Sequence, residues 1–325
     1  MTALLAISSS AKFVDLRVHG WVWLTTLGVI LALLLLDILV LHRTPKVPPV
    51  RKALFETLAW VLVGVAFGIA VIVGYGGSAG GEYFSGYLIE YSLSIDNVFV
   101  WALILSFFKV PAQFQHRVLF WGIFGALILR AGFIFAGIAL IERFEFTLFI
   151  FGGFLLYTAA KLIVSDEAAV DPSDSKFLKL VRRLVPSTDE FDGQKLFTHV
   201  NGRRLATPLF GVLLLVEATD VLFAVDSVPA VLAVSKEQFI VFASNAFAIM
   251  GLRSLYFLLA DMHARFSYLQ QGLAMILAFV GIKMIISRWY HIPTGLSLLV
   301  IGLILAASVA FSLKKTKPGT DEIHL

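Results

Sequence analysis

The chain has 325 residues, of which 59% are hydrophobic and 15% charged, and its mean hydropathy is +0.89, which excludes an ordinary soluble domain with its roughly 25% charged residues. The formal net charge of +4 comes from basic residues scattered through short loops, a pattern typical of contact with anionic lipid headgroups and not of a nucleic-acid partner. The sequence contains no cysteine, so disulfides, thiolate metal ligands and thiol redox switching are excluded.

Apolar runs of about 20 residues, the length that crosses a hydrocarbon core, occur repeatedly along the chain. They cover residues 22–41, 57–74, 83–108, 118–140, 146–164, 206–233, 239–259, 269–287 and 294–313. We therefore expect an all-α integral membrane protein with about nine transmembrane helices.

The longest polar segment, 165–205, divides the chain into two halves. Within it, residues 177–184 combine apolar and basic side chains, which fits either a helix on the membrane surface or a plain linker. We expect N-terminal peripheral helices in 1–82, a three-helix unit in 83–164, a cytoplasmic linker in 165–205, a second three-helix unit in 206–287, and a last helix with a cytoplasmic tail in 288–325.

Lys and Arg near helix ends resist translocation and so mark cytoplasmic loops. Outside the predicted spans they gather after the first, third, fifth and seventh runs and in the C-terminal tail. The pattern predicts an N-terminus outside and a C-terminus in the cytoplasm.

A motif of an acid, five residues, Asp, Asn or Ser, and Val occurs twice, in the third and sixth predicted spans. The copies contain Glu90, Asp96 and Asn97, and Asp220, Asp226 and Ser227. Each copy is followed by an Arg and then a Lys inside the next two spans, namely Arg130 and Lys161, then Arg253 and Lys283. This shared order indicates a duplication. Because the third and sixth spans are predicted to run in opposite directions, we expect an inverted repeat, as in many secondary transporters.

Ionisable groups at bilayer depth cost at least about 2.5–3.5 kcal/mol each, so these acids should face the protein interior or water. Oxygen ligands suit Mn²⁺, Mg²⁺ or Ca²⁺, whereas Zn²⁺, Ni²⁺ and Cu²⁺ prefer nitrogen or sulfur, and all 7 His lie in predicted loops or tails. The predicted cation ligands are Glu90, Asp96, Asn97, Glu217, Asp220, Asp226 and Ser227. For Glu217 a ligand, a proton carrier and a partner of Arg253 all remain open.

The spacing within each copy limits how one ion can be bound. Six residues of a straight helix advance about 9 Å and leave the two side chains about 120° apart, so one unbroken helix does not place both acids on one ion. Either the helix is interrupted, as Pro229 favours in the sixth span by freeing the carbonyl of Val225, or the acids are successive stations on one path. We expect Asp96 and Asp226 to meet near the midplane.

The four intramembrane bases have two interpretations. They are either structural partners of carboxylates or compensating charges that an entering cation displaces; the residues are Arg130, Lys161, Arg253 and Lys283. A buried ion-pair network without transport is the corresponding alternative for the acids. Asn245 is predicted to make an interhelical hydrogen bond.

The segments Glu90-Tyr-Ser-Leu-Ser-Ile-Asp96-Asn97-Val-Phe-Val-Trp and Glu217-Ala-Thr-Asp220-Val-Leu-Phe-Ala-Val-Asp226-Ser227-Val-Pro-Ala resemble the paired signatures of the TerC family, especially its Alx branch. The resemblance extends over most of the chain from about residue 83 onward. It implies a bacterial inner-membrane protein with nine helices, a link by name to tellurite resistance, and manganese export that requires the acids at 90, 96, 217, 220 and 226.

The sequence thus predicts a secondary transporter that exports a hard divalent cation, Mn²⁺ above all, from the cytoplasm, in exchange for protons. Mn²⁺ is then a substrate and no cofactor is expected. A membrane scaffold or insertion factor for stress resistance and an organic-solute exporter are the alternatives. No nucleophile lies beside a His and no nucleotide-binding loop occurs, so an enzyme is not expected. The predicted partners are the cation and membrane lipids, and the protein is either a monomer or a homodimer.

Overall fold

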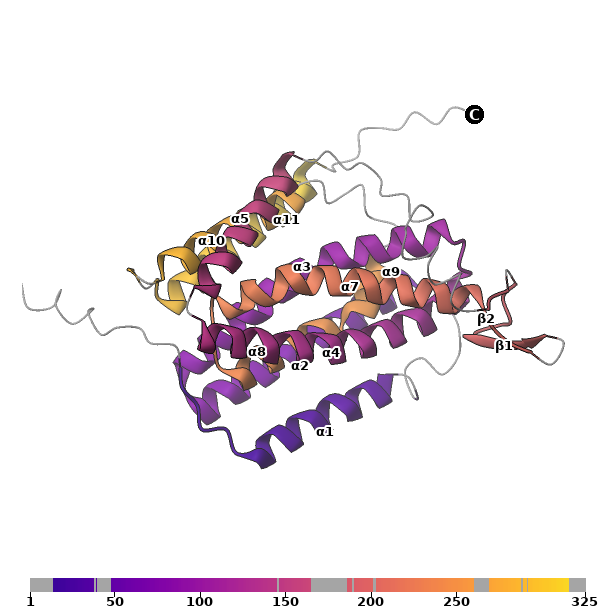
Figure 1. Ribbon diagram of the computed structural model, residues 1–325, viewed down its shortest axis with the longest axis horizontal. Coiled ribbons are helices and arrows are strands. Elements are labelled where there is room, and N and C mark those ends of the chain that lie inside the picture. The colour runs from indigo at the N-terminus through magenta and orange to yellow at the C-terminus, as the bar shows by residue number, and fades with distance from the viewer. Residues whose placement is uncertain are drawn as a thin grey trace, which may run out of the picture.

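A computed structural model describes residues 14–37, 39, 48–144, 146–164, 186–188, 190–200, 203–259, 269–287, 289–290 and 292–315. Helices dominate this part of the chain (Figure 1). They are α1 (Gly20–Leu36), α2 (Val50–Tyr75), α3 (Gly77–Phe107), α4 (Ala112–Arg143), α5 (Thr147–Val164), α7 (Pro208–Leu232), α8 (Gln238–Met250), α9 (Leu252–Leu259), α10 (Leu269–Ile286) and α11 (Thr294–Lys315).

Every predicted apolar run overlaps one of these helices, and the seventh run is divided between α8 and α9 at Gly251. By length and composition, 6 helical segments of the described chain can cross a membrane, the joined α8 and α9 counting as one, and three shorter apolar helices accompany them. The integral membrane fold is therefore confirmed, while nine membrane crossings stay a prediction.

The helices form two groups that meet along α3 and α7. Figure 1 shows α5, α10 and α11 together, tilted against a larger bundle of α1–α4 and α7–α9. Within the smaller group, α5 and α10 approach so closely that a Cβ at Gly152 would lie 2.9 Å from the backbone oxygen of Gly281. Small residues commonly permit such contacts between membrane helices.

The contacts between the two predicted units are reciprocal. The first helix of each unit packs on the second helix of the other, since α3 contacts α8 and α4 contacts α7, and the third helices α5 and α10 contact each other. The motif helices α3 and α7 also pack together. Such pairing fits two related units, although the inverted repeat itself stays a prediction.

Both motif helices are unbroken, which corrects the predicted interruption at Pro229. Helix α7 continues through Pro229 to Leu232, and the amide of Ala233 still donates to the carbonyl of Pro229. Proline removes its own hydrogen bond to the carbonyl of Val225. Because Pro229 lies in the last turn, few helical residues follow it whose bonds could also be disturbed. The two acids of the second copy, Asp220 and Asp226, therefore point in different directions.

The segment before α1 is fixed to one end of the bundle by two carboxylates. The amide of Val14 donates to Glu82 of α3 at 2.8 Å, and the amide of Leu16 donates to Glu237, the residue before α8, at 3.2 Å. Glu82 also accepts a hydrogen bond from Ser235 at 2.6 Å. These contacts position the start of the first helix.

The linker contains a small antiparallel hairpin that sequence reasoning missed. Strand β1 (Phe197–Val200) pairs with β2 (Arg203–Ala206) in the register Phe197↔Ala206 to Val200↔Arg203. The Asn201–Gly202 pair between them is a strong hairpin signal. The predicted surface helix at 177–184 lies outside the described residues.

Candidate cation site

Arg130 of α4 lies at the centre of the predicted site. Its guanidinium, 1% exposed, donates from Nη1 to Glu90 Oε1 on α3, and from Nη2 and Nε to Asp220 Oδ1 at 2.9 Å and Oδ2 at 3.2 Å on α7. Two parallel bonds to one carboxylate are the strongest arrangement that an arginine makes. The arginine of the first unit thus joins an acid of each unit.

Four neutral side chains complete the hydrogen bonds around this ion-pair group. Glu90 accepts from Ser94 Oγ at 2.9 Å and from Asn245 Nδ2 at 2.7 Å, which confirms the predicted interhelical role of Asn245. Ser227 Oγ accepts from Arg130 Nη1 at 3.4 Å. We call these residues the Arg130 cluster; its members are Glu90, Ser94, Asn97, Arg130, Asp220, Ser227 and Asn245.

Asn97 belongs to this cluster through its side-chain amide. In the orientation that satisfies both ends of the amide, its oxygen accepts from Arg130 Nη2 at 3.1 Å and its nitrogen donates to the carbonyl of Leu93 at 3.2 Å. Buried polar groups are costly unless they are paired in this way. The cluster therefore brings one guanidinium to two carboxyl groups, leaving one formal negative charge when both are ionised.

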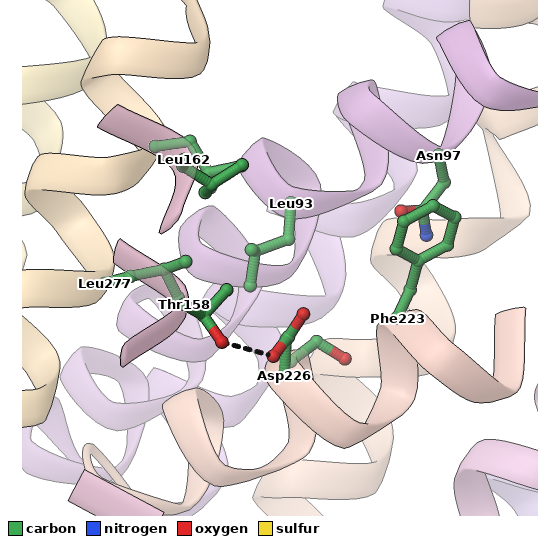
Figure 2. A pocket seen from close by; sticks show the side chains of 9 residues that line it. Leu93, Asn97, Thr158, Leu162, Phe223, Asp226 and Leu277 are labelled. Atoms are coloured by element: carbon green, nitrogen blue, oxygen red, sulfur yellow. Dashed lines mark hydrogen bonds between the residues drawn. The ribbon is translucent and has the colours of Figure 1, made fainter. Parts of the chain in front are cut away.

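Asp226 faces a different space, between the two helix groups. Its Oδ1 accepts a hydrogen bond from Thr158 Oγ1 of α5 at 3.0 Å, and Figure 2 shows these two side chains directed toward each other. They line a pocket of about 70 Å³, a volume that would suit a few water molecules or a small ion. Its lining residues are Leu93, Asn97, Thr158, Leu162, Phe223, Asp226, Ser227, Leu273 and Leu277.

Two residues connect the pocket to the Arg130 cluster. Asn97 and Ser227 both line the pocket and both accept hydrogen bonds from Arg130. In Figure 2, Asn97 lies on the opposite side of the pocket from Thr158, beside Phe223. The acids of the second motif copy thus lie apart, Asp220 on the arginine and Asp226 in the pocket, as the 120° rotation along an unbroken helix requires.

Glu217 is close to the cluster but lies outside its hydrogen bonds. It precedes Asp220 by one helical turn, its carboxyl contacts Gly125 of α4, and its buried Oε2 has no hydrogen-bond partner among the described atoms. The proposed pairing with Arg253 is wrong, because Arg253 is on α9 and forms a buried ion pair with Asp37, the residue after α1.

The other bases lie away from the cluster. Lys161 of α5 is exposed and acts on Asp226 only through its charge. Lys283 of α10 is buried, donates to Ser297 Oγ on α11 at 2.9 Å and lies near Glu82. Of the four predicted compensating charges, Arg130 is the one that directly contacts predicted ligands in the described structure.

The structure therefore brings most, but not all, of the predicted ligands together. Among the described residues, no group of three or more His, Cys, Asp or Glu is arranged to hold a metal ion. The side chain of Asp96 lies outside what the structure describes, although its backbone belongs to α3, so its predicted meeting with Asp226 is untested.

Sequence reasoning missed the polar side chains that support these acids. Ser94 lies four residues after Glu90, a spacing that places both on one helix face. Asp37 lies near the end of the first apolar run, where an interfacial position fits equally well, so its burial against Arg253 could not be read from the sequence. Thr158 and Gly125 gave no comparable signal.

A family model described as "Integral membrane protein TerC family" matches residues 75–319. The chain is 47% identical over 295 residues to an uncharacterized membrane protein of Myxococcus xanthus, covering 91% of this chain and 92% of the relative. It is 44% identical over 282 residues to the "Putative membrane-bound redox modulator Alx" of Escherichia coli K12, covering 84% and 88% of the two chains. An uncharacterized membrane protein of Rickettsia bellii is 39% identical over 294 residues, or 90% of this chain and 97% of the relative. No solved structure matches the chain.

Proposed function

This chain belongs to the TerC family of integral membrane proteins, and on that premise we propose that it exports a hard divalent cation, first of all Mn²⁺, from the cytoplasm. The proposal places the protein in a bacterial inner membrane, with its N-terminus outside and its C-terminus in the cytoplasm. The basic loops support that orientation.

The observation that carries the proposal is the pocket at Asp226. A carboxylate, two hydroxyls and an amide line it, from Asp226, Thr158, Ser227 and Asn97. Oxygen groups of these kinds bind hard cations such as Mn²⁺, Mg²⁺ and Ca²⁺. In the described part of the chain, Asp226 forms no direct ion pair with a base, so its charge is available to a mobile cation.

The position of the pocket between the two helix groups supports alternating access. One wall comes from α5 and α10, and the other from α3 and α7, so a shift of one helix group against the other would change access to it. Carboxyl groups that release a cation can take up protons instead, which supports exchange of protons for the metal.

The choice of Mn²⁺ is the most specific part of the proposal. Oxygen ligands alone do not separate Mn²⁺ from Mg²⁺ and Ca²⁺, and the preference rests on the resemblance of the two acidic motifs to the Alx branch. The E. coli relative is named a redox modulator. In a chain without cysteine, a redox effect through manganese supply is more direct than one through thiols.

Transport assays in proteoliposomes test the proposal. We expect the wild type to move Mn²⁺ across a defined pH gradient. Asp226→Asn should lower the rate by at least about 10- to 100-fold, because losing even an outer-shell partner of a metal ligand has that effect. Glu190→Gln, which changes an exposed carboxylate near the hairpin, is the control and should leave the rate unchanged. Equal rates for wild type and Asp226→Asn would refute the site.

The apolar part of the lining favours a second candidate, an exporter of organic cations. Leu93, Leu162, Phe223, Leu273 and Leu277 supply most of the pocket wall and suit the carbon skeleton of an amine. The same liposomes loaded with small amines separate the two functions, because transport of an amine without Mn²⁺, Mg²⁺ or Ca²⁺ would support the second.

A further inference from the structure

Arg130 contacts oxygen atoms that the sequence assigns to the cation, and two of these residues, Asn97 and Ser227, also line the proposed cation pocket. Its guanidinium bonds to Glu90, Asn97, Asp220 and Ser227, which are four of the predicted ligands. All four contacts are made in a site where the arginine is 1% exposed. A metal ion bound to the same oxygens would have to replace these hydrogen bonds.

The charges of the cluster make that replacement selective. Arg130 brings one positive charge to two carboxyl groups, whereas a divalent ion brings two. If a monovalent ion displaced the arginine, the charge of the site would not change. The two parallel hydrogen bonds from Arg130 to Asp220 would be lost without compensation. A divalent ion gains electrostatic attraction in a region of low dielectric constant, where such attraction is strong.

The pocket gives a route to the arginine. An ion at Asp226 already touches the space lined by Asn97 and Ser227, and these two residues are also contacts of Arg130. The ion therefore meets the arginine's own partners before it reaches Glu90 and Asp220. Asp226 is the first station on this route, and the two acids held by the arginine are the next.

We propose that Arg130 is a tethered competitor of the transported cation: it holds Glu90 and Asp220 until a divalent ion arriving from Asp226 displaces it, and it displaces the ion in turn to release it. This inference rests on the proposed cation transport. It assigns to Arg130 the selection of divalent over monovalent ions and the return of the site to its starting state. A purely structural arginine would stay hydrogen-bonded to Glu90 and Asp220 throughout transport.

Metal titration of the purified full-length protein distinguishes the two roles. Removing a competitor tightens binding, so Arg130→Gln should bind Mn²⁺ about 5- to 150-fold more tightly than the wild type, the usual range of coupling between two ligands. The same variant should lose transport because the ion is no longer released. Its thermal unfolding temperature should be lowered without metal and restored by Mn²⁺, but not by Na⁺.

Arg253→Gln is the matched control, because Arg253 is another buried arginine paired with a carboxylate, outside the Arg130 cluster. It should be destabilised too, yet bind Mn²⁺ with wild-type affinity. Arg130→Lys covers the case in which Arg130→Gln does not fold. Lysine keeps the charge but cannot donate two parallel hydrogen bonds to Asp220. The Arg130→Lys variant should therefore also bind Mn²⁺ more tightly than the wild type.

Two results overturn the inference in different ways. If the wild type binds Mn²⁺ and the Arg130 variants bind it equally or more weakly, the competitor role is wrong and the transport function stands. If the wild type binds none of Mn²⁺, Mg²⁺ and Ca²⁺, the proposed function itself is wrong, and the competitor role falls with it.

Discussion

Arg253 of α9 and Asp37, which follows α1, form a buried ion pair across 216 residues of sequence. The two side chains are 3% and 6% exposed. The pair links the first helix, which the sequence placed at the periphery, to the second unit.

Asp37→Ala should destabilise the protein strongly. Breaking one side of a buried ion pair costs about 3–5 kcal/mol, because the remaining charge stays in a region of low dielectric constant. Asp37→Asn, which keeps an oxygen acceptor, should cost less. Unfolding in detergent measures both, with the exposed Glu190→Ala as the control. Equal stability of wild type and Asp37→Ala would show that the pair contributes nothing.

Gly125→Ala should disturb Glu217 specifically. The added methyl group would occupy the position of the Glu217 carboxyl group, and overpacking of this kind costs about 1–3 kcal/mol. Glu217→Ala in the same chain removes the clash. A double-mutant cycle should therefore show a coupling of about 0.5–3 kcal/mol between the two sites. Strictly additive effects would mean that Glu217 moves away freely.

Adjacent glycines of α5 should respond to alanine with opposite signs. A Cβ at Gly152 would lie 2.7 Å from Ile285 and 2.9 Å from the oxygen of Gly281, whereas a Cβ at Gly153 has nothing within 4 Å. Gly152→Ala should therefore separate α5 from α10 and destabilise the protein. Gly153→Ala should stabilise the helix by about 0.5–1 kcal/mol. Unfolding temperatures that change in the same direction would argue against the close contact.

Glu237 should make stability depend on pH. Burial raises the pKa of this carboxyl above its ordinary 4.5, although the Leu16 and Phe239 amides that donate to it act in the opposite direction. The folded state thus favours the protonated form. Its stabilising contribution is complete below about pH 4.5 and is lost as the pH rises through the raised pKa.

Glu237→Gln tests this dependence because an amide does not titrate and can still accept the hydrogen bond from Leu16. The variant should match the wild type near pH 4 and become the more stable protein as the pH rises above about 5. Unfolding temperatures of both proteins across this range measure the difference. A difference that stays constant with pH would exclude Glu237 as its source.

The helices and the buried acids could be predicted because their signals are local. A long apolar run with few charges forms a helix wherever it is packed, and an acid such as Glu90 inside such a run must find a buried partner. The pairing of these groups is not local. The order of residues does not indicate whether Arg130 contacts Glu90 alone or Asp220 as well. It also does not indicate that Arg253 pairs with Asp37.

The effect of Pro229 shows the same limit on a smaller scale. Its missing amide hydrogen predicts a lost bond but not how much helix follows it, and here α7 ends only three residues later, at Leu232. The pairing of β1 with β2 could have been predicted from Asn201–Gly202, which is a common turn sequence in hairpins. The segment was instead interpreted only as a polar linker between apolar runs.

The double pairing of Arg130 also bears on how the chain is made. Glu90 precedes Arg130 by 40 residues, so it has been synthesised by the time the arginine enters the membrane, whereas Asp220 follows 90 residues later. Glu90 is therefore available as a counter-charge when Arg130 enters the membrane, and an ion pair between them would lower the cost of placing a lone arginine in lipid. Asp220 becomes available only later, when α7 is made.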